Sequence, residues 1–402
     1  MIKNAVETAK TLNNLAALAK ASTENNKGLT LSLDENSPNG KYERTYNSNE
    51  AHAATKIHPR KLKEICDELG INYREDSPKS FRISASDVKK INNKFNPPNS
   101  KGKGKEPVIW CVTQQKGGSG KTTMVVTLAT GLSTECLNQW RIAVLDFDPQ
   151  GTATAALKPN FNKNDFSAGD LLTGNYSLGE GETYQDLCRK SLYKTNLPNL
   201  NILCAREEDR YYETYVESKR IEANKEGVPY SSYKDLNKII DAIKDDYDII
   251  IIDTSPYFSS ATYAAHFAAN NLIIPMRPSE NDIDSSEKYL EHLANTYPLL
   301  AGQGHTGYDN IVIQPTATGT TVAHIDMIAR IKDTYREHCS PYDFPLSDAV
   351  LHCAKEYSTI YDLSASEYTL GGKQAFRRAQ TLTLQIVRDI ESKSKQYLEN
   401  RT

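Results

Sequence analysis

One short segment constrains the fold of this chain more than any other. An apolar, mostly β-branched run at Val108–Val112 leads into the sequence QQKGGSGKTT at 114–123, and a helical pattern follows through Leu132. Glycines let successive backbone N–H groups turn toward phosphate oxygens, and the N-terminus of the following helix adds partial positive charge. The order of strand, glycine loop and helix therefore predicts a phosphate-binding loop in an α/β fold.

Several residues of this loop are expected to bind a nucleoside triphosphate together. We expect the loop backbone to surround the β-phosphate, Lys121 to reach the β- and γ-phosphates, and the Thr122 hydroxyl to bind Mg²⁺. The predicted nucleotide-binding residues of the loop are Lys116, Gly117, Gly118, Ser119, Gly120, Lys121, Thr122 and Thr123.

Two later apolar runs end in aspartates. Ile142–Leu145 is followed by DFDPQG, which begins at Asp146, and Ile249–Ile252 is followed by DTSP, which begins at Asp253. The carboxyl ends of neighbouring parallel strands face the same crevice, so these carboxylates should lie near the phosphates. Asp253 suits the Walker B role of holding Mg²⁺ through water, Asp146 suits support of the metal and of Thr122, and Asp148 suits orientation of the attacking water. Asp146, Asp253 and Pro256 complete the predicted nucleotide site, and Thr122, Asp146 and Asp253 form its metal-binding part.

Short apolar runs recur along the C-terminal three quarters of the chain. They are too continuous for strands with one exposed face, which predicts an α/β fold with a mostly parallel sheet flanked by helices. The predicted strands are Val108–Val112, Ile142–Leu145, Leu200–Leu203, Ile249–Ile252, Leu272–Ile274 and Ile311–Ile313. The polar stretch between Asn160 and Asp246 gives no clear pattern of elements.

Taken together, KGGSGKTT, DFDPQG and IIIIDTSP resemble the ParA/MinD branch of P-loop ATPases, which carry a deviant Walker A motif, over Pro107–Lys393. The resemblance implies that the protein binds ATP and Mg²⁺, forms a homodimer around ATP and hydrolyses it slowly when a ParB-like centromere-binding partner stimulates it. It also implies that Lys116 crosses to the nucleotide of the partner subunit. Lys116, Lys121 and Asp148 are then the residues expected to carry catalysis. The family usually has two prolines in the second switch, whereas this chain has Ser255 at the first of them.

The N-terminal quarter is more basic than the rest of the chain. Between Thr55 and Lys105 there are thirteen Lys and Arg against six Asp and Glu, although the whole chain has a net charge of −3. A solvated face or a lysine-rich linker would explain this, but a nucleic-acid surface is the favoured interpretation. Pro59 and Gly70 bound one helical pattern, a short hairpin is expected at Tyr73–Ile83, and a second helix starts after Ser84.

This pattern of helix, hairpin and helix predicts a small winged helix-turn-helix domain, as in the larger subclass of ParA proteins, whose extension binds operator DNA. We expect an N-terminal helix and linker at 1–54, the winged domain at 55–96, a linker at 97–106 and the ATPase domain at 107–402. The helix at Met1–Ala21 has an apolar stripe, and either its own domain or another subunit could cover it. The residues predicted to position the operator are Arg60, Lys61, Lys63, Arg74, Lys79 and Arg82.

The resemblance also implies nonspecific DNA binding by the ATP-bound dimer, with higher-order filaments on DNA as a further hypothesis. Lysine and arginine neutralise phosphates without reading sequence. The candidates in the C-terminal half are Arg330, Lys332, Arg336, Lys373, Arg377 and Arg378. We expect a cytoplasmic, nucleoid-associated protein without membrane contact, because the chain lacks a long apolar run.

Three rival interpretations remain. A MinD-like ATPase that cycles on membranes needs a basic amphipathic C-terminal helix, whereas Thr381–Thr402 mixes acids with its lysines. A nitrogenase-type reductase needs cluster-binding cysteines, and the seven cysteines show no such spacing. A repressor with a vestigial ATPase is disfavoured by the intact Lys121, Asp148 and Asp253.

Overall fold

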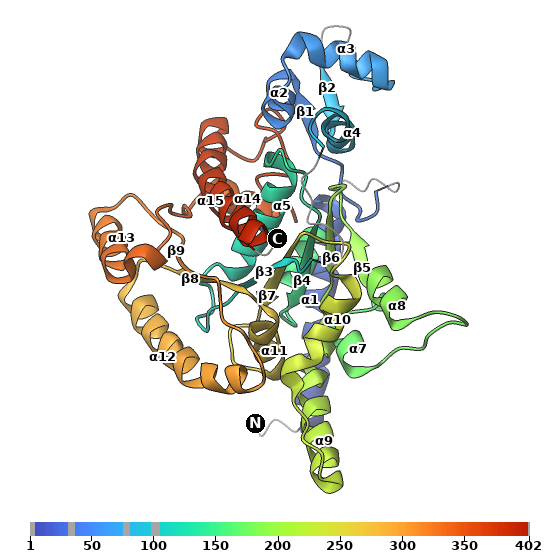
Figure 1. Ribbon diagram of the computed structural model, residues 1–402, viewed down its shortest axis with the longest axis vertical. Coiled ribbons are helices and arrows are strands. Elements are labelled where there is room, and N and C mark those ends of the chain that lie inside the picture. The colour runs from blue at the N-terminus through green and yellow to red at the C-terminus, as the bar shows by residue number, and fades with distance from the viewer. Residues whose placement is uncertain (1–4, 31–36, 75–80, 98–104, 401–402) are drawn as a thin grey trace.

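A seven-stranded sheet forms the centre of the molecule (Figure 1). The computed structural model describes residues 5–30, 37–74, 81–97 and 105–400. The strand order is β5-β6-β4-β7-β3-β8-β9, and every neighbouring pair is parallel except β5 and β6. The bounds are β3 Val108–Val112, β4 Ile142–Phe147, β5 Leu192–Lys194, β6 Leu200–Leu203, β7 Ile249–Thr254, β8 Asn271–Met276 and β9 Asn310–Pro315. The predicted mostly parallel sheet is confirmed, and the edge strand β5 is an addition to the six predicted strands.

Both faces of the sheet are buried, as the continuous apolar runs predicted. Along β3, Trp110 and Val112 face one apolar core, while Ile109 and Cys111 face the other. The first core contains α5 (Lys121–Glu135), α14 (Asp348–Lys355) and α15 (Lys373–Asn400). The second contains α7 (Ala168–Thr173), α8 (Tyr184–Ser191), α9 (Tyr211–Glu226), α10 (Asp235–Ile243), α11 (Ser260–Ala268), α12 (Glu280–Gly302) and α13 (Val322–Tyr335). The remaining elements of this part are α6 (Thr152–Leu157) and the 3-10 turns η1 (Glu207–Arg210), η2 (Ser232–Lys234) and η3 (Arg336–His338).

A small module precedes the sheet and lies at the top of Figure 1. It consists of β1 (Thr45–Asn47), α2 (Ser48–Thr55), α3 (Pro59–Leu69), β2 (Arg82–Ser84) and α4 (Ala85–Phe95). The predicted helix boundaries hold: Pro59 opens α3, Gly70 ends it with φ of 66°, and Ser84 forms a capping box with Asp87 at the start of α4.

Two details of this module differ from the prediction. The expected linker at 22–54 is wrong for much of its length, because the N-terminal helix α1 runs from Ala5 to Thr30 and residues 45–55 form β1 and α2. The strand partner of β2 is β1, although the Arg82 amide also donates to the Tyr73 carbonyl across the expected hairpin. The centre of that hairpin, including Lys79, lies outside the described residues.

The small module is joined to the part that contains the seven-stranded sheet by buried polar contacts. The Arg44 guanidinium pairs with Glu135 at the end of α5 and also donates to the Tyr361 carbonyl. Just before it, the Lys41 ammonium pairs at 2.9 Å with Asp362, and both side chains are buried. Buried pairs of this kind hold their geometry because each charge loses its compensation when the partner moves away. The junction therefore fixes the module against the end of the helix that follows the phosphate-binding loop.

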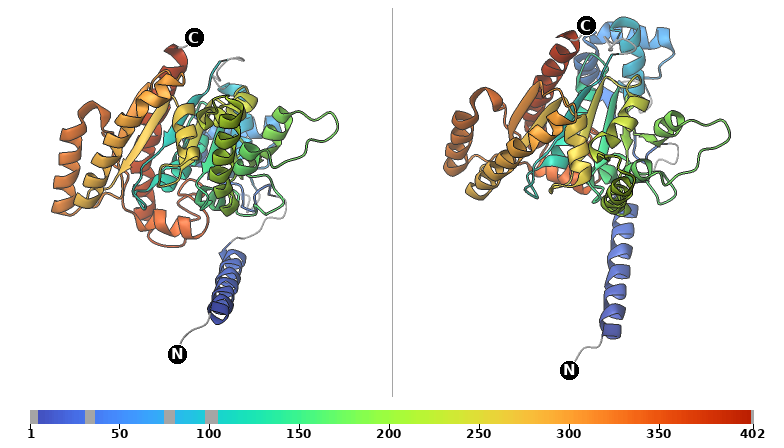
Figure 2. Two further views of the ribbon diagram at one scale, coloured as in Figure 1. Left: turned by 90° about the horizontal axis from the view of Figure 1, so that it is seen from below. Right: turned by 60° about the horizontal axis from the view of Figure 1, so that its bottom comes forward.

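Helix α1 extends away from the rest of the molecule in both views of Figure 2. Its leucines Leu12, Leu15 and Leu18 are exposed, so the described parts of the chain do not cover the predicted apolar stripe. Covering by another subunit stays a prediction. Among the described residues, no helix combines the length and the apolar character that crossing a membrane requires.

Candidate nucleotide site

The phosphate-binding loop connects β3 to α5, and both of its ends are anchored to neighbouring elements. Gly118 and Gly120 have φ of 76° and 94°, a conformation that side-chain-bearing residues rarely adopt. On one side, the Thr316 hydroxyl after β9 donates to the Ser119 carbonyl at 2.7 Å. On the other side, the Gln114 side chain donates to the Ser286 hydroxyl of α12 at 2.9 Å. The loop is thus held in shape by the fold.

Lys121 is the first residue of α5, and its side chain is only 7% exposed. Burial lowers the pKa of this ammonium group, while the carboxylates of Asp253 and Asp148 act in the opposite direction. Lys121 is a buried cation beside the carboxylates of Asp253 and Asp148. Such a cation suits a bound anion whose negative charge exceeds that of the two carboxylates. The predicted position of Lys121 at the centre of the site agrees with this geometry.

Asp253 ends β7 at the sheet edge that faces the loop and is fully buried. Neither of its carboxylate oxygens is in a hydrogen bond of ordinary geometry with the described residues. Burial raises its pKa well above the usual range, the charge of Asp146 adds to this, and Thr122 and Lys121 counteract it. A buried carboxylate without donors is costly unless a cation or a bound water compensates it. Asp253, with the adjacent Thr122 hydroxyl, therefore fits the predicted Mg²⁺ site.

Asp146 stands beside Asp253 on the neighbouring strand β4, but its oxygens are already engaged. One oxygen accepts from the backbone and the hydroxyl of Thr154 at 2.8 and 2.7 Å, and the other accepts from the Asp148 amide at 3.1 Å. Burial raises the pKa of Asp146 to about 7. The structure thus brings together all three predicted aspartates and reveals Thr154, a contact that sequence reasoning missed.

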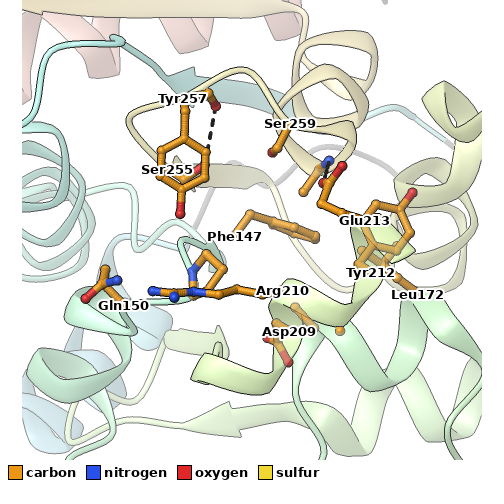
Figure 3. A pocket seen from close by; sticks show the side chains of 14 residues that line it. Phe147, Gln150, Leu172, Asp209, Arg210, Tyr212, Glu213, Ser255, Tyr257 and Ser259 are labelled. Carbon is orange, nitrogen blue, oxygen red and sulfur yellow. Dashed lines mark hydrogen bonds between the residues drawn. The ribbon is translucent and has the colours of Figure 1, made fainter. Parts of the chain in front are cut away.

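A cavity of about 520 Å³ separates the two segments that follow β4 and β7 (Figure 3). Phe147 and Gln150 border it from the first segment, and Ser255, Tyr257 and Ser259 border it from the second. Its further walls come from α7 and from the start of α9, where the Glu213 carboxylate accepts from the Ser260 amide of α11 at 3.1 Å. The two catalytic segments therefore face each other across open space.

Ser255, which stands where the family usually has proline, is buried at the turn after β7. Its hydroxyl lies 3.4 Å from that of Thr262, which in turn donates to the Tyr257 carbonyl at 3.0 Å. Pro256 follows it at the rim and is partly exposed. These two hydrogen bonds join the turn after β7 to the start of α11.

A second, smaller cavity of about 210 Å³ adjoins the other side of the loop. Gly118, Gly120 and Thr123 border it from the loop side, with Arg277, Thr316, Phe344 and Leu346 opposite. An apolar hollow beside a phosphate-binding loop suits the base of a nucleotide. The residues opposite the loop were not predicted, because they stand more than 150 positions after it and carry no local motif.

The structure distributes the predicted DNA-binding residues over distant surfaces. Four of the predicted cations are exposed on α3 or just after it: Arg60, Lys61, Lys63 and Arg74. In contrast, Arg82 pairs with Glu367. On α13, Arg330 pairs with Glu280 and Lys332 pairs with Asp343, while Arg336 is exposed at the end of the helix. Lys373, Arg377 and Arg378 are exposed in the first turns of α15. Helix α3 lies at the top of Figure 1 and α13 at its left side, so the two groups of cations are well separated.

Comparisons with known proteins agree with the fold and the motifs. A family model described as an AAA domain matches residues 108–297. The plasmid partition protein A of Escherichia coli is 26% identical over 204 residues, which cover 50% of this chain and 49% of that protein. The sporulation initiation inhibitor protein Soj of Bacillus subtilis is 27% identical over 252 residues, which cover 61% of this chain and 88% of Soj. The chain thus spans about half the length of the first of these relatives.

Solved structures extend the likeness to the whole molecule. A structure named partition protein superimposes with a TM-score of 0.67 at 18% identity, covering 97% of this chain and 99% of that one. An ATP complex of McdA from Cyanothece gives a TM-score of 0.53 at 18% identity, covering 70% and 97%. At such identities the structures show a common fold. With the lysine pair of the loop and the aspartates at the ends of β4 and β7, these matches identify a P-loop ATPase that is similar in sequence and in fold to plasmid partition proteins.

Proposed function

We propose that this protein is a DNA-partition ATPase that binds ATP with Mg²⁺, pairs with a second copy of itself, binds nonspecific DNA and hydrolyses ATP slowly when a ParB-like partner stimulates it. The observation that carries the proposal is the carboxylate of Asp253, which is fully buried beside Lys121 and Thr122 and has no hydrogen bond of ordinary geometry with the described residues. This arrangement is costly in an empty site and favourable once a triphosphate and its cation are bound.

The chain's own groups bind and orient the nucleotide. The amides of 117–120 and the Lys121 ammonium neutralise the phosphate tail, and the small cavity beside Thr316 receives the adenine. Thr122, Asp146 and Asp253 would hold Mg²⁺, which would supply charge neutralisation to the phosphates. These contacts place the γ-phosphate toward the segment that carries Asp148.

Asp148 is proposed to orient the water that attacks the γ-phosphate. Its side chain is 7% exposed and lies near enough to Lys121 for its charge to offset part of the fall that burial causes in the pKa of that ammonium group. Phosphoryl transfer needs mainly positioning and charge neutralisation, which matches slow turnover until a partner improves the alignment. The 520 Å³ cavity between the two catalytic segments leaves them room to close.

Lys116 is proposed to act across the dimer. Its backbone follows Gln114 at the start of the loop, and its side chain is partly exposed and forms no ion pair with the described residues. A lysine in this position is available to a phosphate from outside its own subunit. Two copies would then enclose two ATP molecules, and pairing would depend on the γ-phosphate.

DNA is proposed to bind at two kinds of surface. The exposed cations of α3 suit operator DNA and repression of the protein's own operon, and those of α15 suit nonspecific DNA. Filaments on DNA and a cytoplasmic, nucleoid-associated location extend the same proposal. A MinD-like membrane cycle is the alternative, but α15 already buries Ile386, Val387 and Ile390 against its own domain and so does not offer that apolar face to a lipid surface.

The decisive experiment is sedimentation of the full chain without nucleotide, with ADP, and with ATP plus Mg²⁺. We expect dimers only with ATP, and we expect nonspecific duplex DNA to bind only to that species. The Lys121→Ala variant should stay monomeric in all three conditions. A wild-type protein that neither retains ATP nor pairs in its presence contradicts the proposal.

A further inference from the structure

Thr154 lies in α6, in the sequence DFDPQGTAT that begins with Asp146, and it joins three segments of the site. Its amide and its hydroxyl both donate to the same oxygen of Asp146, at 2.8 and 2.7 Å. The same hydroxyl accepts from the Ala205 amide at 2.8 Å, just after β6. Thr154 and Asp146 are buried, so water does not compete for these bonds.

The second oxygen of Asp146 continues the chain of hydrogen bonds to the catalytic segment. It accepts from the Asp148 amide at 3.1 Å, and the Asp148 carboxylate accepts from the Gln150 amide at 3.0 Å. An unbroken series therefore runs from the Ala205 amide through Thr154 and Asp146 to the backbone of Asp148. Because this backbone determines where the Asp148 carboxylate points, the Thr154 hydroxyl helps to set that direction.

The anchor at Ala205 belongs to a rigid part of the fold. It follows β6, which is hydrogen-bonded to β4 in the central sheet. The segment after it continues to Asp209 and Arg210, which border the cavity in Figure 3. Thr154 thus connects the segment after β4 to the segment after β6, which leaves the sheet and forms one wall of the cavity. The segment after β7 forms the opposite wall.

We propose that Thr154 is a positioning residue for ATP hydrolysis: its hydroxyl fixes Asp146, and through Asp146 it fixes Asp148 toward the attacking water. The inference rests on the proposed role of Asp148. It gives Asp146 two roles, because this residue positions Asp148 in addition to supporting the metal. It also predicts that the hydroxyl matters more for the chemical step than for nucleotide affinity, because the hydrogen bonds of Thr154 to the described residues join Asp146 and Ala205 and none joins the phosphate-binding loop.

The test compares Thr154→Val, which keeps the shape of the side chain and removes the hydroxyl, with Thr154→Ser, which keeps the hydroxyl. We expect Thr154→Val to lower kcat roughly tenfold to a hundredfold, the range seen when reacting groups are misplaced by about 1 Å. The KM for ATP and the ATP affinity should change less than about twofold, and Thr154→Ser should retain most of the wild-type kcat.

Thr383→Val is the matched control. Thr383 is buried on α15, and its hydroxyl bonds the Ala379 carbonyl and the Tyr361 hydroxyl, so its loss removes comparable bonds away from the site. This variant should lose stability in thermal unfolding and keep its kcat. If Thr154→Val does not fold, Thr154→Ala compared with Thr154→Ser provides the same contrast.

A double-mutant cycle separates positioning from a general loss of structure. Once Asp148→Ala has stalled hydrolysis, adding Thr154→Val should lower the residual rate no further, because both changes act through one group. A wild-type kcat in Thr154→Val, a loss confined to KM, or additive effects in the cycle would each overturn the inference. Wild-type turnover by Asp148→Ala would instead refute the proposed role of Asp148 itself.

Discussion

Asp146 and Asp253 are register partners on the adjacent parallel strands β4 and β7, at the sheet edge beside the phosphate-binding loop. Their hydrogen bonding differs sharply. Asp146 accepts three hydrogen bonds from Thr154 and Asp148, whereas Asp253 accepts none of ordinary geometry from the described residues. Asp146 therefore organises the protein in addition to its predicted support of the metal, whereas Asp253 remains available to a cation.

Replacing Lys121 with alanine should abolish ATP binding. The buried ammonium interacts electrostatically with Asp253 and Asp148, and a hydrogen bond to a charged group contributes up to about 3 kcal/mol. We expect the ATP affinity measured by calorimetry to fall by more than about a hundredfold. Lys225→Ala on the exposed surface of α9 makes the same change in charge and should leave affinity unaltered. An affinity loss below about threefold would contradict the assignment of Lys121.

Replacing Asp148 with alanine should separate binding from hydrolysis. The variant should still form ATP-dependent dimers, because the groups that hold the phosphates remain in place. Its steady-state turnover should fall by at least about a hundredfold if the attacking water loses its orientation. Phosphate release and sedimentation, measured on the same preparation, check both halves. Turnover equal to wild type would remove the water-orienting role.

DNA binding should be ATP-dependent and steeply sensitive to salt. The double variant Arg377→Gln/Arg378→Gln removes two exposed cations of α15, so the slope of log affinity against log salt should become shallower by about two units. Arg330→Gln should have a smaller effect, because Arg330 already pairs with Glu280. Filter binding over a salt series measures both. An affinity that does not depend on nucleotide would count against partition.

The buried pair between Lys41 and Asp362 should be important for stability. Lys41→Met leaves the Asp362 carboxylate buried without its cation, which typically costs about 3–5 kcal/mol. The free energy of unfolding from urea titrations measures the loss. Lys225→Met on the surface should change it by less than about 0.5 kcal/mol. A loss in Lys41→Met as small as in this control would show that the junction does not depend on the pair.

The same pair predicts a pH dependence of stability. Burial raises the pKa of Asp362, but Lys41 and Asn196 more than offset this, so its pKa in the folded protein lies below the ordinary value. A group with a depressed pKa in the folded state stabilises above its unfolded pKa and loses this contribution as pH falls through the folded value. The stability advantage of wild type over Asp362→Asn should therefore be full at pH 7 and shrink below about pH 4. An advantage that is independent of pH would contradict this.

Local sequence patterns predicted the elements that carry the chemistry. The six predicted strands are all present, because continuous apolar runs such as Ile249–Ile252 have few alternatives to a strand buried on both faces. The helix ends at Pro59, Gly70 and Ser84 could also be predicted, because the interactions that begin or end a helix involve residues only a few positions apart. Apart from the strand Leu200–Leu203, the elements of the stretch at 160–246 could not be predicted, because α8, η1, α9 and α10 have polar faces and take their positions from contacts with one another and with the sheet.

The phosphate-binding loop and the aspartates at the ends of β4 and β7 follow from local sequence, because those motifs place their functional atoms through the local backbone. The support of these groups depends on contacts that form only in the folded chain. Thr154 forms hydrogen bonds with Asp146 and Ala205, and Thr316 forms one with Ser119. No local sequence pattern predicts these contacts between different segments. Burial then gave the two neighbouring carboxylates different roles, since the free energy of a buried charge depends on the donors that the folded chain places around it.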